Sequence, residues 1–370
     1  MADRSQRGVA LLVVLLAVAI LTVVVLEFTY RAQVEYRRAV AWVRVKQARL
    51  IADSGVAIAA EMLARAPLLY ALQYAGEEKV ADGLSEMWAQ RCEEEGPSIC
   101  PANVRRSCTL DTFDANRLGL RIRDEDSFYN LNRLVKGASA ERERFAQILA
   151  RAAIAPETLQ GILDWTSRSS RGTTVSLPPG STLRGHELSF PVRGGALATF
   201  GELAFLPRIR AADLIKLRRF ATVLDPREDD VNVNTAPLEL LASLHPDLAD
   251  QTLLSRLHAA RCVRPFADAP ALRAALGETR KLPFEPLLAY RSEYFRVEAT
   301  GEVDEFYQSV EALLRRPYPE EGQPANRTEW AVTLEYYLPR RGPLIDPAMM
   351  QSPSALSEFA GESPTPGGLL

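Results

Sequence analysis

The cysteines are the residues of this 370-residue chain best suited to covalent linkage or metal binding. Cys92, Cys100 and Cys108 lie close together in the sequence, whereas Cys262 is far from all three. Such crowding favours an oxidising compartment and a local disulfide bridge. We expect the bridge to join two of the three crowded cysteines, although their spacing does not choose the pair. Zinc is the weaker alternative, because no C-x-x-C pair occurs and the 3 histidines are scattered.

Two short segments repeat a pattern of asparagines two residues apart. The first contains Asn130 and Asn132, and the second contains Asn232 and Asn234, followed by Pro237. On an extended chain such asparagines face the same way. The last asparagine of each pair is placed to cap the helix that follows it, and a proline in the first helical turn fits this arrangement. We interpret all four as structural residues, and ligand binding is the weaker alternative.

The sequence contains none of the common catalytic motifs: no G-x-S-x-G elbow, Walker loop, H-E-x-x-H helix or G-x-G-x-x-G turn. We therefore expect no enzyme activity, no catalytic residues and no required cofactor. The net charge of −3 also lacks the basic excess that nucleic-acid binding needs. Asp225 and the run from Glu228 to Asp230 are interpreted as a solvated turn, because calcium needs several oxygens held close together.

The amino-terminal segment is predicted to anchor the chain in a membrane. Val9 to Leu26 is an uninterrupted apolar run, long enough to cross a bilayer as a helix. Helical composition continues to Ala66, and we expect Pro67 to end the helix. Because a helix from 9 to 66 extends about 87 Å, its outer half must pack on protein. Its apolar stripe is predicted to be an assembly face, formed by Ala41, Val45, Ala48, Ala52, Val56, Ala59 and Leu63. The alternative is that this stripe packs on the chain's own sheet.

The remainder of the chain is mixed. Strands are predicted at 104–110, 118–123, 294–301, 306–315 and 329–337, because apolar and polar residues alternate there. A long helical region lies between the second and third of these strands, with helices predicted at 140–153, 156–165, 200–206, 211–223, 237–244, 248–260 and 270–276. From 341 to 370 proline, glycine and serine dominate, which predicts a disordered tail.

The leader carries a family resemblance. Basic residues, Gly8 and an immediate apolar helix resemble the type III signal of type IV pilins and pseudopilins. By that resemblance, a prepilin peptidase cuts between Gly8 and Val9, and Val9 becomes N-methylated. A plain membrane anchor in which Gly8 has no role is the alternative.

One departure from the general pilin pattern is informative. Pilins usually carry glutamate at the fifth mature position, where this chain has Val13. A carboxylate in the membrane needs a partner charge, and in a fibre that partner is the amine of the subunit above. Lacking this glutamate, the chain resembles the general secretion pathway protein K family, minor pseudopilins of type II secretion thought to cap the pseudopilus. The asparagine pairs also resemble that family's Asn-x-Asn segments.

The resemblance implies an α+β fold: a long transmembrane helix packed on a small antiparallel sheet, with a large helical domain inserted. The expected units are a leader at 1–8, the helix at 9–66, a pilin-like α/β unit at 67–127 and 290–340, the insertion at 128–289 and the tail. Implied partners are other minor pseudopilins, the major pseudopilin, prepilin peptidase and the inner membrane, with the bulk of the chain in the periplasm.

Two further implications concern ligands. Members of the protein K family can bind calcium in the helical domain, but here Asp164 and Trp165 are followed by a segment rich in serine and arginine. The second asparagine segment also resembles the start of a helix-hairpin-helix, so the alternative function is a membrane-anchored DNA-binding protein. Its turn from His245 to Asp250 lacks the glycines that present backbone N–H groups to phosphate. We therefore expect protein packing there and no nucleic acid.

Overall fold

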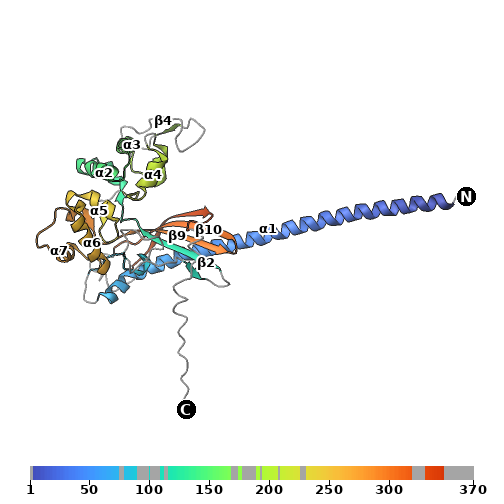
Figure 1. The fold of residues 1–370 in the computed structure, drawn as a ribbon, viewed down its shortest axis with the longest axis horizontal. Coiled ribbons are helices and arrows are strands. Elements are labelled where there is room, and N and C mark those ends of the chain that lie inside the picture. Colours follow the sequence, from blue (N-terminus) through green and yellow to red (C-terminus); the bar gives the residue numbers. More distant parts are fainter. Residues whose placement is uncertain are drawn as a thin grey trace, which may run out of the picture.

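The structure is a computed structural model. It describes residues 3–74, 79–89, 100, 109–111, 116–167, 174–176, 189–191, 194–206, 209–225, 231–318 and 330–345. The long helix, the sheet and the inserted helices can be followed in Figure 1, and the α+β fold class is confirmed. The strand predicted at 104–110 lies largely outside the described residues.

A single helix, α1 (Asp3–Gln73), dominates the outline of the molecule. Its amino-terminal half projects freely, and its other half lies against the sheet (Figure 1). The segment Leu11–Gln73 contains an 18-residue window with a mean hydropathy of 3.0, none of it buried, which is long and apolar enough to span a membrane. The free half of α1 therefore has the properties of the predicted membrane segment.

The prediction that Pro67 ends the helix was wrong, because α1 continues through it to Gln73. Proline has no N–H and so leaves the carbonyl four residues earlier, that of Leu63, without its helical partner. The Arg316 guanidinium donates to this carbonyl at 3.1 Å, and the backbone N–H of Trp330 donates to the Ala64 carbonyl at 3.1 Å. Tertiary contacts thus satisfy the carbonyl groups at the proline.

The sheet has five antiparallel strands in the order β1-β2-β9-β10-β11. They are β1 (Thr109–Asp111), β2 (Arg117–Asp124), β9 (Tyr294–Val303), β10 (Phe306–Arg315) and β11 (Thr333–Arg341). Strand β2 pairs with β9, with Leu120 opposite Ala299, although the helical insertion separates the two strands in sequence. The insertion therefore leaves and re-enters the sheet at adjacent strands.

One face of the sheet packs on α1. The core between them contains Ala52, Val56, Ala59 and Leu63 from the helix and Phe295, Val297, Ala299, Val310, Ala312 and Leu314 from the sheet. Gly301 sets the closest approach, because a Cβ atom there would lie 2.0 Å from the carbonyl oxygen of Ala48. Glycine at this position lets the backbones of helix and strand touch.

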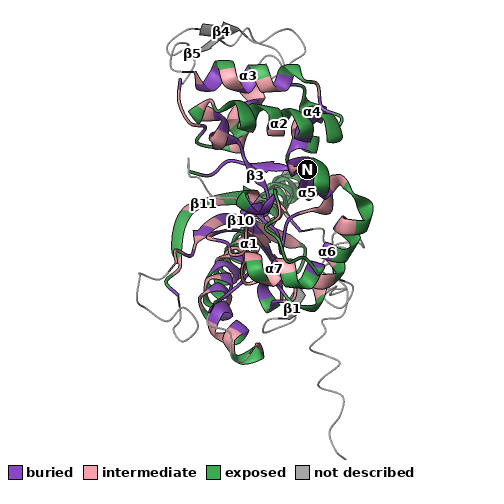
Figure 2. Ribbon diagram, turned by 90° about the vertical axis from the view of Figure 1, so that its left-hand side faces the viewer, coloured by how far each residue is buried: buried purple, intermediate pink, exposed green. Residues whose placement is uncertain are grey.

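The insertion consists of two consecutive lobes. The first lobe runs from β3 (Tyr129–Asn130) to β6 (Ala221–Thr222), two strands that pair in parallel. Between them lie η4 (Leu131–Lys136), α2 (Ser139–Arg151), α3 (Glu157–Thr166), β4 (Thr174–Ser176), β5 (Ser189–Pro191), η6 (Phe200–Phe205) and α4 (Ala211–Leu217). Figure 2 shows α2, α3 and α4 as a separate lobe above β3.

The second lobe repeats this plan. It runs from β7 (Val231–Asn232) to β8 (Leu288–Ala289), which also pair in parallel. Between them lie α5 (Leu238–Leu244), η7 (Pro246–Ala249), α6 (Gln251–Val263), α7 (Ala269–Leu276) and η8 (Glu285–Leu287). One hydrophobic core extends through both lobes, from Tyr129 to Leu288. A short helix, η1 (Met87–Ala89), lies in the segment that leads from α1 toward the sheet.

The tail prediction was wrong at its start. Ile345 is 1% exposed, and the backbone N–H of Leu344 donates to the Ser309 hydroxyl at 3.0 Å. Residues 342–345 therefore pack on the sheet surface opposite α1, because Ser309 and Thr300 provide buried hydroxyl acceptors there. Residues 346–370 lie outside the described part of the chain.

Candidate functional site

The first asparagine pair ties the first lobe together. The Asn130 side chain accepts the N–H of Asn132 at 3.1 Å and that of Leu224 at 3.2 Å. Asn132 donates to the carbonyls of Leu197 at 2.9 Å and Leu224 at 2.6 Å, and accepts the N–H of Leu197 at 2.7 Å. The pair thus joins the beginning, middle and end of the lobe.

The second pair repeats this arrangement. Asn232 accepts the N–H of Asn234 at 3.0 Å. Asn234 donates to the carbonyls of Phe266 at 3.0 Å and Tyr290 at 3.2 Å, and accepts the N–H of Phe266 at 2.8 Å. Both pairs lie in buried positions, where a polar group needs a partner. These hydrogen bonds join backbone segments of one lobe, and a purely structural role for the four asparagines stays a prediction.

The predicted capping geometry was wrong. Asn130, the first asparagine of its pair, caps η4, and Asn132 lies inside that helix. At the second pair, Pro237 precedes α5, and no side chain caps the helix. The reason is that an asparagine accepts most readily from the N–H two residues further on. This leaves the second asparagine free to bind more distant backbone.

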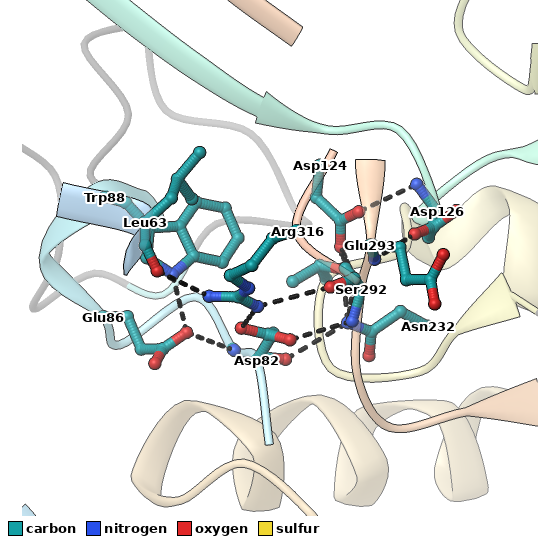
Figure 3. A network of polar contacts seen from close by, with 12 residues as sticks. Leu63, Asp82, Glu86, Trp88, Asp124, Asp126, Asn232, Ser292, Glu293 and Arg316 are labelled. Atoms are coloured by element: carbon teal, nitrogen blue, oxygen red, sulfur yellow. Dashed lines mark hydrogen bonds and ion pairs between the residues drawn. The ribbon is translucent and has the colours of Figure 1, made fainter. Parts of the chain in front are cut away.

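Asn232 differs from Asn130 because it also reaches the sheet. Its amide donates to the Ser292 hydroxyl at 2.7 Å and to the Asp82 carbonyl at 3.2 Å. Ser292 donates in turn to the Asp124 carboxylate at 2.6 Å. Figure 3 shows these side chains converging where the second lobe meets the sheet. We call Asp82, Glu86, Asp124, Asp126 and Arg316 the junction cluster.

Arg316 is the centre of this cluster. It is fully buried, forms an ion pair with Asp82 and donates to the carbonyls of Leu63 at 3.1 Å and Ser292 at 3.3 Å. Asp82 also accepts the N–H of Ser292 at 2.8 Å. One guanidinium therefore connects α1, the segment before η1 and the start of β9 (Figure 3).

The two aspartates beside β2 complete the junction. Asp124 accepts the N–H of Asp126 at 2.8 Å and a hydrogen bond from the Thr235 hydroxyl. Asp126 accepts the N–H groups of Glu293 at 2.6 Å and Tyr294 at 3.1 Å. None of the five residues of the junction cluster was predicted from the sequence. Asp124 and Asp126 stand in a run of acids at the end of a strand, a pattern that is also common on surfaces, and Asp82, Glu86 and Arg316 belong to no such run.

The electrostatics of the junction are uneven. Burial and the nearby Asp126 raise the pKa of Asp124 to about 7. Burial and Asp82 also raise the pKa of Glu86 well above its usual range. Burial would raise the pKa of Glu125 too, but Arg123 and Arg296 hold it below its ordinary value. At the junction, Asp124 and Glu86 therefore resist ionisation, whereas the nearby Glu125 stays charged.

We expect the stability of the chain to fall as pH rises from about 5 to 8 through the contribution of Asp124. Its folded pKa lies above the unfolded value, so the folded state binds its proton more tightly and loses that advantage through a pH of about 7. In thermal melts across this range, Asp124→Asn should show a flatter pH dependence than the wild type. Equal slopes would contradict the assignment. The lowered pKa of His258 makes its contribution to stability rise with pH. Because both proteins carry His258, this contribution drops out when their slopes are compared.

The predicted cysteine pairing needs correction. Cys100 forms a disulfide with Cys262 on α6, 162 residues away, and the two Cα atoms are 5.3 Å apart. Proximity in sequence was misleading because the fold brings the segment after η1 against the second lobe, where Lys79 also pairs with Asp268 at 2.7 Å. Cys92 and Cys108 lie outside the described residues, so a local bridge between those two stays a prediction.

The predicted assembly face was also largely wrong. Ala48, Ala52, Val56, Ala59 and Leu63 are buried against the chain's own sheet. Small residues at this spacing serve the close approach of helix and sheet, as at Gly301. Ala41 and Val45 are half-buried, and their part in assembly stays a prediction.

The opposite side of α1 is uncovered and carries four exposed apolar residues among polar ones such as Gln47 and Ser54. Tyr36, Val43, Leu50 and Ile58 recur every seven or eight residues, and are 72%, 46%, 65% and 39% exposed. At 3.6 residues per turn, this spacing places them on one side of the helix, away from the buried stripe. One face of the helix thus packs on the chain's own sheet, and the opposite face is exposed to solvent.

The processing and tip residues all lie on the free half of α1. Gly8 and Val9 are inside the helix, and the structure does not describe their side chains. Val13 is 59% exposed, as a side chain facing lipid or another helix would be. The structure therefore keeps these three residues apart from the asparagine pairs and the junction cluster.

Asp164 lies where the resemblance implies a calcium site, and residues 168–173 of that loop lie outside the described part of the chain. Asp164 accepts from Gln160 at 2.6 Å and is exposed. Within the described residues, no group of three or more His, Cys, Asp or Glu side chains could hold a metal ion. The donors described around Asp164 therefore do not fit calcium.

The turn compared with a DNA-binding hairpin is built for packing. Asp250 caps α6 by accepting the N–H of Leu253 at 2.8 Å, and Leu248 is fully buried. The His245 ring accepts the N–H of Asp247 at 3.2 Å. These contacts use local N–H groups that a phosphate would need.

Comparison with known proteins finds a similar sequence and a similar structure. No protein-family model matches the chain. The chain is 29% identical over 252 residues to type II secretion system protein K of Pseudomonas aeruginosa, covering 65% of this chain and 68% of that protein. Its fold matches a chain of the GspK–GspI–GspJ complex from the type 2 secretion system of enterotoxigenic Escherichia coli, with a TM-score of 0.50 and 15% identity, covering 84% of this chain and 99% of that one.

These features first define a class: a pilin-like protein whose long apolar helix packs on a small sheet and whose sheet carries an inserted helical domain. The chain is also similar in sequence to type II secretion system protein K, and its fold is that of a chain of the GspK–GspI–GspJ complex.

Proposed function

We propose that this chain forms the tip of a type II secretion pseudopilus, starts its assembly with other minor pseudopilins and takes part in exporting folded proteins across the outer membrane. The uncovered face of α1 carries this proposal. Four large apolar side chains of one helix face stay in solvent beyond the membrane segment, and burying them against another helix is favourable. The structural relative was solved in a complex of three secretion proteins, which supports minor pseudopilins as partners.

Assembly can be tested separately from folding on the two faces of α1. Leu50→Arg places a charge on the uncovered face, so co-purification with partner pseudopilins should be lost while the free energy of unfolding changes by less than about 0.5 kcal/mol. Ala52→Leu is the matched variant on the buried face and should cost about 1 to 3 kcal/mol by overpacking. Unchanged co-purification of Leu50→Arg would refute the uncovered face as the assembly face.

The amino terminus supports a second part of the proposal. A glycine followed at once by an apolar helix is the substrate pattern of prepilin peptidase, so the mature chain should begin at Val9 with a methylated amine. Mass spectrometry of the amino terminus, after purification from the native host, should find this species. A chain retaining Met1, or an unmethylated Val9, would contradict processing. Co-expression without the peptidase provides the unprocessed control.

Val13 supports the tip position. A subunit at the top of the fibre has no neighbour above it whose amine a glutamate could neutralise, and an unpaired carboxylate in lipid costs about 2 to 3 kcal/mol on insertion scales. The two helical lobes also extend well beyond the sheet, and one copy at the end of a fibre obstructs no stacking (Figure 1). The proposal includes an inner-membrane anchor, a periplasmic bulk, contacts with the major pseudopilin and no required cofactor or catalysis.

A further inference from the structure

We infer that the first helical lobe is a positively charged docking surface for an acidic face of a partner protein. Its composition sets it apart from the rest of the chain. Between residues 128 and 225 the sequence carries 14 lysines and arginines against 8 acids, a net charge of +6, although the whole chain is at −3. The second lobe, residues 231–290, carries 6 of each and is neutral. The excess is therefore local.

The described residues of this lobe carry 9 lysines and arginines against 7 acids, and four of these cations lie where α2 and α4 end. The Lys216 ammonium donates to the Ala153 carbonyl at 2.9 Å, which brings the end of α4 to the end of α2. Arg151 precedes this contact, and Arg218 and Arg219 follow it; all four cations are exposed. Within the described residues, none of the four forms an ion pair, whereas Arg210 nearby is paired with Asp213 at 2.7 Å.

Helix stabilisation accounts for part of this pattern. Cations near a helix C-terminus interact favourably with the macrodipole, and Lys216 binds a carbonyl there. It does not account for Arg219, which lies beyond α4 and whose side chain forms no hydrogen bond, ion pair or ring contact within the described residues. Nor does it account for Ile215, a large apolar residue that is 73% exposed beside these cations. An apolar centre surrounded by guanidinium groups is the composition of a binding surface.

The residue types favour a protein over a membrane. Three of the four cations are arginine, which is enriched at protein interfaces and binds carboxylates through two parallel hydrogen bonds. Lipid surfaces instead need a broad apolar helix face, and Ile215 is the large apolar side chain that the seven-residue α4 exposes. Figure 2 shows this lobe standing clear of the sheet, and the uncovered face of α1 belongs to another part of the molecule.

The test uses the full chain in detergent, a fluorescent poly-L-glutamate peptide and vesicles with or without phosphatidylglycerol. The peptide should bind with an affinity that falls as salt rises, and Arg151→Glu/Arg219→Glu should weaken it roughly tenfold or more. Both side chains are exposed, and neither forms an ion pair within the described residues. The control, Arg280→Glu/Lys281→Glu, makes the same change in net charge on exposed residues of the second lobe and should stay within about twofold of the wild type.

Two results would overturn the inference. One is an equal loss of peptide affinity in both double variants, which would show that binding depends only on the net charge of the chain. The other is binding to phosphatidylglycerol vesicles that Arg151→Glu/Arg219→Glu abolishes while peptide binding persists, which would assign the surface to a membrane. Co-purification with partner pseudopilins should be unchanged in both variants, so this test can fail without the assembly proposal failing.

Discussion

Replacing Arg316 with methionine should destabilise the chain by about 3 to 5 kcal/mol, the range for breaking a buried ion pair by removing one partner. The substitution leaves Asp82 buried with neither its cation nor a solvent shell, and removes the donor to the Leu63 carbonyl. Urea unfolding of the full chain in detergent measures the loss. The same guanidinium connects α1 to the junction cluster. The substitution should therefore weaken the contacts of α1 and those of the second lobe at the junction at the same time.

The neighbouring arginine provides the control. Arg315 is 41% exposed and meets Glu293 at 3.4 Å, so Arg315→Met should cost less than about 1 kcal/mol. Adding Asp82→Asn to Arg316→Met should recover part of the loss, because the unpaired charge is then gone. Equal effects of Arg315→Met and Arg316→Met would contradict the central position of Arg316.

Gly301→Ala should cost about 3 kcal/mol, at the upper end of what overpacking costs. Its Cβ would lie 2.0 Å from the backbone oxygen of Ala48, so the helix must move away from β9 and loosen the core between them. Gly195→Ala is the matched control, since no atom lies within 4 Å of a Cβ there. Unfolding curves of both variants measure the difference, and the midpoint should fall only for Gly301→Ala. Similar midpoints would mean that the helix does not touch the strand.

Local pattern was enough to place most elements. Strand β10 occupies the predicted residues 306–315, and α2, α3, α5 and α7 lie within one or two residues of their predicted starts. The helix predicted at 211–223 is shorter, because Arg218 and Arg219 form a turn and Ala221 then pairs with Tyr129. Alternation and helical periodicity follow from each segment's own sequence, whereas that strand depends on a residue far away in the chain.

The errors in the site share one physical cause. The end of α1, the Cys100–Cys262 bridge and the junction cluster each depend on contacts between distant segments. Pro67 looked like a helix end because its compensating donors, Arg316 and the backbone of Trp330, come from the other end of the chain. Buried acids such as Asp124 look in the sequence like surface acids. Only the fold shows that Ser292 and Thr235 approach them.

The small-residue stripe of α1 shows the limit most directly. Spacing predicted a face that packs closely, and the face from Ala48 to Leu63 does so. The sequence could not say whether the neighbour was the chain's own sheet or another subunit. The structure assigns this face to the sheet and leaves Val43 and Leu50 uncovered on the other side.

The position of the chain in the fibre tests the account most directly. Pseudopili assembled in the native host from all partner subunits can be labelled with gold through a tag placed after Leu370 and viewed by electron microscopy. If the chain forms the tip, each fibre should carry label at a single end. The Leu50→Arg variant should yield fewer fibres than the wild type. Label distributed along the shaft would contradict the tip assignment.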